Sequence, residues 1–301
     1  MYHTILVPLD GSAFSERALP MATTLARAMG ANMVLMRAAS ASAFPGADPT
    51  EAQCQAVEEA HAGLSALATG LAEQGLSVEV AVPYGDAAES ILLEIGLRGA
   101  DLVVMCTHGR SGLGRWIYGS VAEQVLARSP APVLLVHPTG EVATLWPESA
   151  QVSMLVPLDG SSFAETALPH AASLARVFGG TILLLRAVAR PVASYSYPGM
   201  GLVQESLEEE HREAESYLGE VAQRLRSDSL SVQTVVREGW PADIIVYRGA
   251  ELGSRLIVMA THGRTGVVRL LLGSVALEVV RRSPLPVLLV RPTELAETAP
   301  V

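Results

Sequence analysis

Short runs of aliphatic residues alternate along the chain with longer, alanine-rich stretches in which apolar positions recur at helical spacing. A short apolar run predicts a buried strand, and an amphipathic stretch between two such runs predicts a crossover helix. This alternation is typical of a parallel sheet covered by helices. In the first half we expect strands at 4–9, 32–38, 77–82, 101–106 and 132–136, and helices at 15–29, 51–73, 86–98 and 120–128.

The second half repeats the first. Three blocks recur in the same order, which identifies a tandem repeat: 5–20 matches 154–169, 107–125 matches 261–279, and 128–139 matches 282–293. We therefore expect the second set of strands at 153–158, 181–187, 231–236, 255–260 and 286–290. Five strands with four crossovers in each half predict two tandem doubly wound α/β domains with five-stranded parallel sheets.

The repeat also predicts the domain boundaries. We assign a first domain to 1–140, a linker to the polar, proline-bearing segment 141–151, a second domain to 152–293 and a tail to 294–301. With 301 residues in total, each half has a length at which folding buries a substantial core.

Composition narrows the class of protein. The chain is 50% hydrophobic, yet no apolar run approaches the length of a membrane helix, and the first residues do not resemble a secretion signal. We expect a cytoplasmic protein that does not enter a membrane. The net charge of −10, without a basic cluster, argues against nucleic acid as a partner. The two cysteines, Cys54 and Cys106, predict neither disulfides nor a metal site.

Candidate chemistry gathers at the predicted carboxyl ends of the strands, where ligands bind in sheets of this type. Asp10 and Asp159 follow the first strand of each half. Gly119 and Ser120, like Gly273 and Ser274, stand at the predicted start of a helix, where free amides and the helix dipole suit a phosphate group. The glycine loop that precedes Gly119 contains the pattern G-x-x-G-x-G, which is not the order of a Rossmann fingerprint. A Walker A loop is also excluded, because the chain has no lysine.

Simpler interpretations of the same residues remain open. Glycines can serve only to allow positive φ in turns, and the aspartates can hold their own turns. His108 and His262 fit structural loop residues better than catalytic ones, because no nucleophile and acid recur with them. Arginines 110, 115, 264 and 269 can neutralise phosphate or be solvated. The acidic run 205–218 is typical of a solvated helix face.

These motifs together resemble the universal stress protein family in its tandem form. The resemblance rests on V-P-L-D in the first strand, the glycine loop before G-S, and the ending S-P-x-P-V-L-L-V of each half. It implies a fold like that of the adenine nucleotide alpha hydrolases, with strand order 3-2-1-4-5, and pairing of two domains along their fifth strands. The family pattern has a glycine where this chain has Cys106 and Ala260.

The resemblance also implies a set of contacts to ATP or another adenine nucleotide, which can carry a bound Mg²⁺ ion. Aspartates and prolines at the first strand would contact the adenosine end, small residues after the second strand would lie beside the base, and the glycine loop would face the phosphates. The residues so implied are Pro8, Asp10, Ala38, Gly109, Gly119, Ser120 and Val121 in the first half, and Pro157, Asp159, Ala187, Gly263, Gly273, Ser274 and Val275 in the second.

Three functions follow from this reading. The leading hypothesis is a stress-response regulator or sensor that binds adenine nucleotide in one or both halves. The second is a nucleotide-free interaction scaffold whose sites have decayed, and the third is a slow ATP hydrolase. Since no general base stands at a suitable position, the sequence favours a binding protein over an enzyme. We expect the two halves to pair within the chain, and a homodimer is a further expected assembly.

Overall fold

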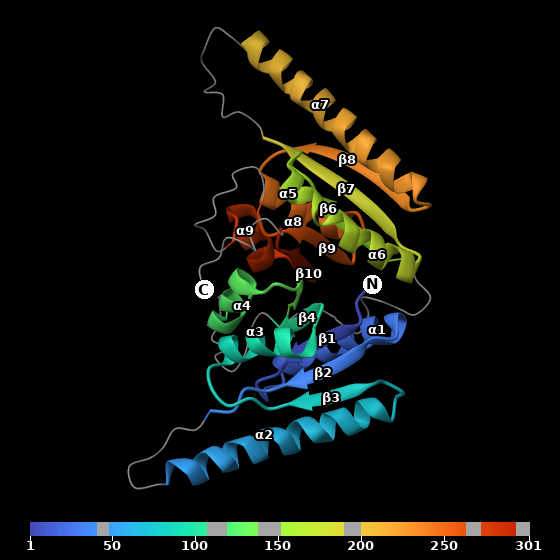
Figure 1. The fold of residues 1–301 in the computed structure, drawn as a ribbon. Coiled ribbons are helices and arrows are strands. Elements are labelled where there is room, and N and C mark those ends of the chain that lie inside the picture. The colour runs from blue at the N-terminus through green and yellow to red at the C-terminus, as the bar shows by residue number, and fades with distance from the viewer. Residues whose placement is uncertain (41–47, 107–118, 138–151, 190–199, 263–271, 293–301) are drawn as a thin grey trace. The chain divides into compact units, whose positions relative to one another are not determined.

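A computed structural model of the chain describes residues 1–301 except 41–47, 107–118, 138–151, 190–199, 263–271 and 293–301 (Figure 1). The side chains of residues 49 and 200–206 are likewise outside the described part. The chain divides into two compact units, within Met1–Trp146 and Pro147–Pro292. The predicted linker, 141–151, lies outside the described residues, so its boundaries stay a prediction.

The first unit is a five-stranded sheet with connecting helices. Its strands follow the order β3-β2-β1-β4-β5, and neighbouring strands run parallel. The predicted strand order is therefore confirmed for this unit. The elements are β1 (Thr4–Pro8), the 3₁₀ turn η1 (Ser15–Ala18), α1 (Leu19–Met29), β2 (Asn32–Met36), α2 (Pro49–Ala72), β3 (Val78–Ala81), α3 (Ala87–Arg98), β4 (Leu102–Cys106), α4 (Ser120–Arg128) and β5 (Val133–Val136).

The second unit repeats this plan with its strands in the order β8-β7-β6-β9-β10, again parallel. Its elements are β6 (Ser153–Pro157), α5 (Ser162–Glu165), α6 (Leu168–Phe178), β7 (Thr181–Val188), α7 (Met200–Ser227), β8 (Ser231–Glu238), α8 (Pro241–Glu251), β9 (Leu256–Ala260), α9 (Ser274–Arg282) and β10 (Val287–Val290). The acidic run 205–218 thus lies within α7, a helix of 28 residues.

The first crossover differs from its prediction. Instead of one helix over 15–29, a short 3₁₀ turn precedes α1. Pro20 lies in the first turn of α1, and a proline in a helix interior would lack an amide donor and clash with the preceding turn. Starting the α-helix at Leu19 places the proline where no amide donor is needed. Gly30 then ends the helix with φ of 65°, a left-handed conformation that glycine adopts without strain.

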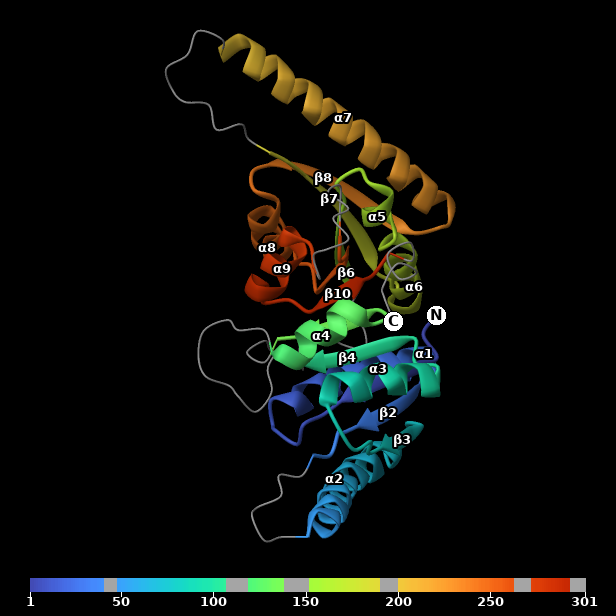
Figure 2. The ribbon, with the colours of Figure 1, turned by 60° about the vertical axis from the view of Figure 1, so that its left-hand side comes forward.

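The strands form the core. Ile5, Leu6 and Val7 of β1 are fully buried, and all of β4 is buried, as expected for a sheet covered on both faces. Helix α2 packs along β3 and α7 along β8, while α3 lies beside α4 and α8 beside α9 (Figure 1; Figure 2). No helix in the described ranges is long and apolar enough to cross a membrane.

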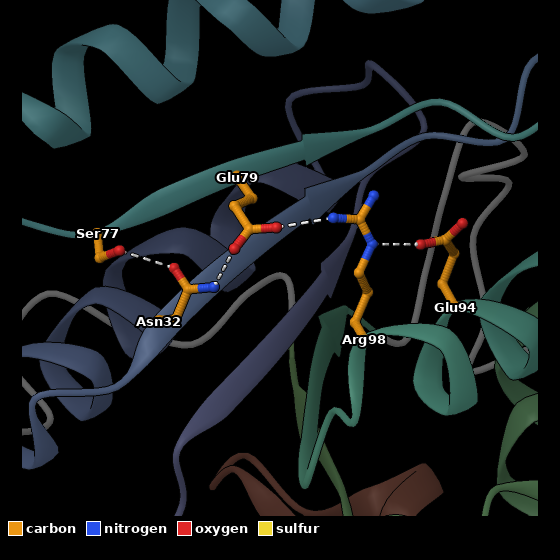
Figure 3. A network of polar contacts seen from close by, with 5 residues as sticks. All are labelled: Asn32, Ser77, Glu79, Glu94 and Arg98. Carbon is orange, nitrogen blue, oxygen red and sulfur yellow. Dashed lines mark hydrogen bonds and ion pairs between the residues drawn. The ribbon is translucent and has the colours of Figure 1, made fainter.

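A polar network ties α3 to the amino ends of β2 and β3 (Figure 3). The Ser77 hydroxyl donates to Asn32 over 2.9 Å, and the Asn32 amide donates to Glu79 over 2.8 Å. Arg98 then donates to Glu79 over 2.7 Å and to Glu94 over 3.1 Å. Because ligands in such sheets bind at the opposite, carboxyl edge, we assign this network a structural role.

Candidate functional site

A pocket of about 520 Å³ opens at the carboxyl edge of the second sheet. The ends of β6, β7 and β9 and the start of α9 form its walls, with further residues from α7 and α8. Six of the seven residues predicted for this half line it together: Pro157, Asp159, Ala187, Gly273, Ser274 and Val275. The seventh, Gly263, lies outside the described residues.

Asp159 holds the turn that follows β6. Its Oδ1 atom accepts hydrogen bonds from the Ser161 backbone nitrogen over 3.0 Å and from the Ser161 hydroxyl over 2.6 Å. Asp10 does the same for Ser12 in the first unit, over 2.9 and 2.6 Å. Both aspartates therefore hold their own turns, as the simpler interpretation predicts. Since half-buried Asp159 also lines the pocket, a turn role does not prevent contact with a ligand.

Gly273 and Ser274 form the end of the pocket that suits an anion. Helix α9 begins at Ser274, with Gly273 in an extended conformation before it. The first amides of an α-helix have no acceptor within the helix and carry the positive end of its dipole. The Gly273 amide itself donates to the Thr261 carbonyl over 2.8 Å. Amides from Ser274 onward, together with the exposed Ser274 hydroxyl, are therefore the donors available to a phosphate.

The structure shows why glycine stands before this helix. A Cβ atom on Gly273 would lie 3.0 Å from the Thr261 carbonyl oxygen, so a side chain here would require this backbone to shift by a few tenths of an ångström. The interpretation that these glycines allow positive φ is wrong here, because φ is −62° at Gly273 and −64° at Gly119. Gly109 lies outside the described residues.

The predicted residues of the first unit take corresponding places in its sheet. Pro8 ends β1, half-buried Asp10 follows it, and half-buried Ala38 follows β2. Gly119 precedes α4, and Ser120 and Val121 are its first two residues. The parallel order β2-β1-β4 brings these segments to one edge of the sheet. His108, Arg110 and Arg115 lie outside the described residues, as do Arg264 and Arg269.

Three charged residues in the second pocket were not predicted as site residues. Arg186 at the end of β7 lines the pocket, as do Glu210 and Glu213 from α7. The acidic run was interpreted as a solvated helix face, and although both glutamates are exposed, this part of the helix also borders the pocket. No local sequence signal could reveal this, because it depends on how α7 packs across β7 and β8.

His262 also lines the pocket, with its Nδ1 atom 3.1 Å from the buried Thr261 hydroxyl. In the described ranges no group of three or more histidine, cysteine, aspartate and glutamate side chains is placed to hold a metal ion. Cys106 is buried at the end of β4, while Ala260, at the same position of β9, lines the pocket. The described pocket thus combines the start of α9 with the carboxylates of Asp159, Glu210 and Glu213 and with Arg186.

Fold and site together define a protein with two doubly wound α/β units and a ligand-sized pocket at the carboxyl edge of its second sheet. The sequence profile of the universal stress protein family matches residues 1–137 and 153–291. Those two segments cover most of the chain, one in each unit, so the chain belongs to this family.

Individual relatives agree with this assignment. A universal stress protein of Mycolicibacterium smegmatis is 28% identical over 96% of this chain and 97% of its own length. One of Thermus aquaticus is 34% identical and matches 46% of this chain with all of its own length, as a single-repeat relative would. The crystal structure of a universal stress protein from Archaeoglobus fulgidus has a TM-score of 0.72 at 22% identity, over 96% of this chain and 98% of its own.

Proposed function

We propose that the protein binds ATP or a related adenine nucleotide and acts as a cytoplasmic stress-response regulator or sensor. The observation that carries this proposal is the pocket that brings Asp159, Ala187 and the start of α9 together. Its volume of about 520 Å³ falls within the range of pockets that hold small ligands and cofactors.

Each part of the pocket suits one part of a nucleotide. The amides and hydroxyl at Ser274 fit phosphate oxygens, and the carboxylate of Asp159 is an acceptor for ribose hydroxyls. Backbone groups beside Ala187 can accept from and donate to an adenine edge. Glu210 and Glu213 add acceptors toward α7. The described residues offer no preformed metal cage, so a Mg²⁺ ion that accompanies ATP would be held mainly by the phosphates.

The corresponding residues of the first unit, with Asp10, Ala38, Ser120 and Val121, form the second proposed site. We retain the predicted domain boundaries, pairing of the two halves through their fifth strands and a homodimer as proposals that rest on the sequence. Binding without turnover is part of this proposal and rests on the sequence.

The direct test is mass spectrometry of the ligand released when protein purified without added nucleotide is denatured, followed by calorimetric ATP titration of the stripped protein. We expect adenine nucleotide, lost when Gly119 and Gly273 are both replaced by alanine. Release of no nucleotide, with no heat on titration, would leave the scaffold hypothesis. ATP turnover abolished by Ser120→Ala with Ser274→Ala would instead favour the hydrolase.

A further inference from the structure

Arg37 and Arg186 occupy equivalent positions in the two units. Each stands immediately before the alanine predicted to lie beside the base, Ala38 or Ala187, and each is half-buried. The surroundings of the two guanidinium groups differ, however, and the difference traces to the long helix of each unit.

In the second unit Arg186 lies against an aromatic ring and lines the pocket. Its Cζ atom is 5.3 Å from the centroid of the Tyr217 ring on α7, which is within the range of a cation–π contact. The guanidinium of this pocket residue thus has the Tyr217 ring as a neighbour.

The hydroxyl end of the Tyr217 side chain is in turn fixed by a hydrogen bond. Its hydroxyl donates to Glu165 Oε1 over 2.9 Å, and Arg224 donates to Glu165 Oε2 over 2.7 Å. The carboxylate on α5 therefore connects two residues of α7 that lie on the same helical face, about two turns apart. We refer to Tyr217, Glu165 and Arg224 as the tyrosine clamp.

The first unit has only part of this arrangement. Helices α2 and α7 can be aligned on two buried residues in each: Ala60 matches Ala214, and Leu64 matches Leu218. In this alignment Gly63 takes the position of Tyr217. The spatial contacts agree, because Nη1 of Arg37 lies 3.9 Å from a Cβ built on Gly63. The same alignment places Gly70 at the position of Arg224, while Glu16 matches Glu165 in the repeat. The first unit therefore keeps the glutamate, as Glu16, but has glycines in place of the Tyr217 ring and of Arg224.

Arg37 lies against the turn after β1. A Cβ atom on Gly11 would be 2.8 Å from Nη1 and 2.9 Å from Cζ of Arg37. Gly11 directly follows Asp10, the residue predicted to contact the adenosine end. The guanidinium of the first unit therefore covers the turn that its ligand would have to approach.

We propose that Tyr217 is a positioning residue that makes the two nucleotide sites unequal: it holds Arg186 in the wall of the second pocket, whereas Gly63 lets Arg37 settle on the Asp10 turn of the first. The inference rests on the proposed function. Its physical basis is preorganisation: a flexible arginine that is already held beside Ala187 loses less entropy when the base of a nucleotide packs against it. A ligand of the first unit has to displace Arg37 from Gly11, and that displacement lowers its affinity.

The test is ATP titration by calorimetry with one site disabled at a time. In a Gly119→Ala background, which leaves the second site, we expect Tyr217→Gly to weaken ATP binding about tenfold, equivalent to about 1.4 kcal/mol. Tyr217→Phe keeps the ring and should stay within about threefold. Ser216→Gly is the matched control, because it places a glycine at the neighbouring exposed position of α7 and carries the same helix cost.

The reciprocal change is Gly63→Tyr in a Gly273→Ala background, which leaves the first site. Gly63 is exposed, and among the described residues a Cβ there meets Arg37 at 3.9 Å, an ordinary van der Waals distance. We expect tighter ATP binding. A crystal structure of this variant should show Arg37 withdrawn from Gly11 and stacked on the new ring. Tighter binding with that movement would support the proposal.

The outcomes separate the two proposals. ATP binding by the wild type that Tyr217→Gly leaves unchanged, or equal affinity at the two wild-type sites, would overturn this inference alone. Failure of the wild type to bind ATP at millimolar concentration would overturn the proposed function and this inference with it.

Discussion

The backbone nitrogen of Gly273 donates a hydrogen bond to the carbonyl oxygen of Thr261 over 2.8 Å. This bond joins the end of β9 to the start of α9 and so sets where the amides of Ser274 and its successors face the pocket. A side chain would crowd this bond, since a Cβ on Gly273 would approach the same oxygen to 3.0 Å.

We therefore expect Gly273→Ala to destabilise the protein by about 1–3 kcal/mol, the usual cost of forcing extra atoms into a packed site. ATP affinity should also fall, because the helix start has to shift. Urea unfolding followed by circular dichroism, and calorimetry, measure the two effects. Gly219→Ala is the matched control: Gly219 is exposed within α7 with nothing within 4 Å of its Cβ position, and alanine there should stabilise by up to about 1 kcal/mol. Equal stability of Gly273→Ala and wild type would contradict the packing argument.

The turn and ligand roles of Asp159 can be separated by substitution. Asp159→Asn keeps an oxygen that can accept from Ser161 and suits this type of turn, so folding stability should change by less than about 1 kcal/mol while ATP affinity falls. Ser161→Ala removes one of the two hydrogen bonds to the carboxylate and also the cap of α5, in which the Ser161 hydroxyl accepts from the Ala164 nitrogen. It should cost about 1–2 kcal/mol of stability with little effect on binding. Chemical denaturation and ATP titration of both variants give the answer. If both lose affinity equally, the carboxylate acts on the ligand only through its turn.

Tyr217 should ionise late in an alkaline titration. Burial, followed by its hydrogen bond to Glu165, raises the pKa of the Tyr217 phenol above its ordinary value of 10.0. Because the folded-state pKa is higher than the unfolded one, this residue's contribution to stability is fully present below pH 10 and is lost as the pH rises above it.

We expect Tyr217→Phe to remove one late phenolate absorbance step and to reduce the loss of unfolding free energy above pH 10. The measurement is ultraviolet absorbance at each pH together with urea unfolding. Burial likewise raises the pKa of Tyr2, so one late step should remain in the variant. Loss of an ordinary step near pH 10, with the late steps unchanged, would show that Tyr217 is solvated.

Two buried serines should respond oppositely to alanine. The Ser254 hydroxyl is the one buried side-chain polar atom in the described part of the chain without a hydrogen-bond partner. Ser283, also buried, donates from its hydroxyl to the Leu285 carbonyl over 3.1 Å and accepts from the Leu285 nitrogen over 3.0 Å.

Ser254→Ala should therefore leave stability unchanged or raise it by up to about 1 kcal/mol, because it removes an unpaired buried hydroxyl, whereas Ser283→Ala should cost about 1–2 kcal/mol. Urea midpoints of the two variants measured side by side test the difference. Destabilisation of equal size in both would mean that the Ser254 hydroxyl is satisfied by a partner such as water.

The fold was largely predictable because its signals are local. Apolar runs such as Leu102–Cys106 become buried strands, and the repeated blocks show that both halves share one plan. The exceptions have equally local causes: Pro20 divides the first crossover into a 3₁₀ turn and α1. Side-chain bonds within the aspartate turns were likewise among the alternatives that the sequence left open.

By itself, then, the sequence determined the two α/β units, their strands and the residues such as Asp159 and Ser274 that meet at the carboxyl edge of the second sheet. Only the tertiary structure decided that Glu210 and Glu213 of α7 border the pocket, and that Arg186 lies on Tyr217 while Arg37 lies on Gly11. The physical reason is that a long, flexible side chain takes its position from whatever packs beside it, and those neighbours come from elements distant in the chain.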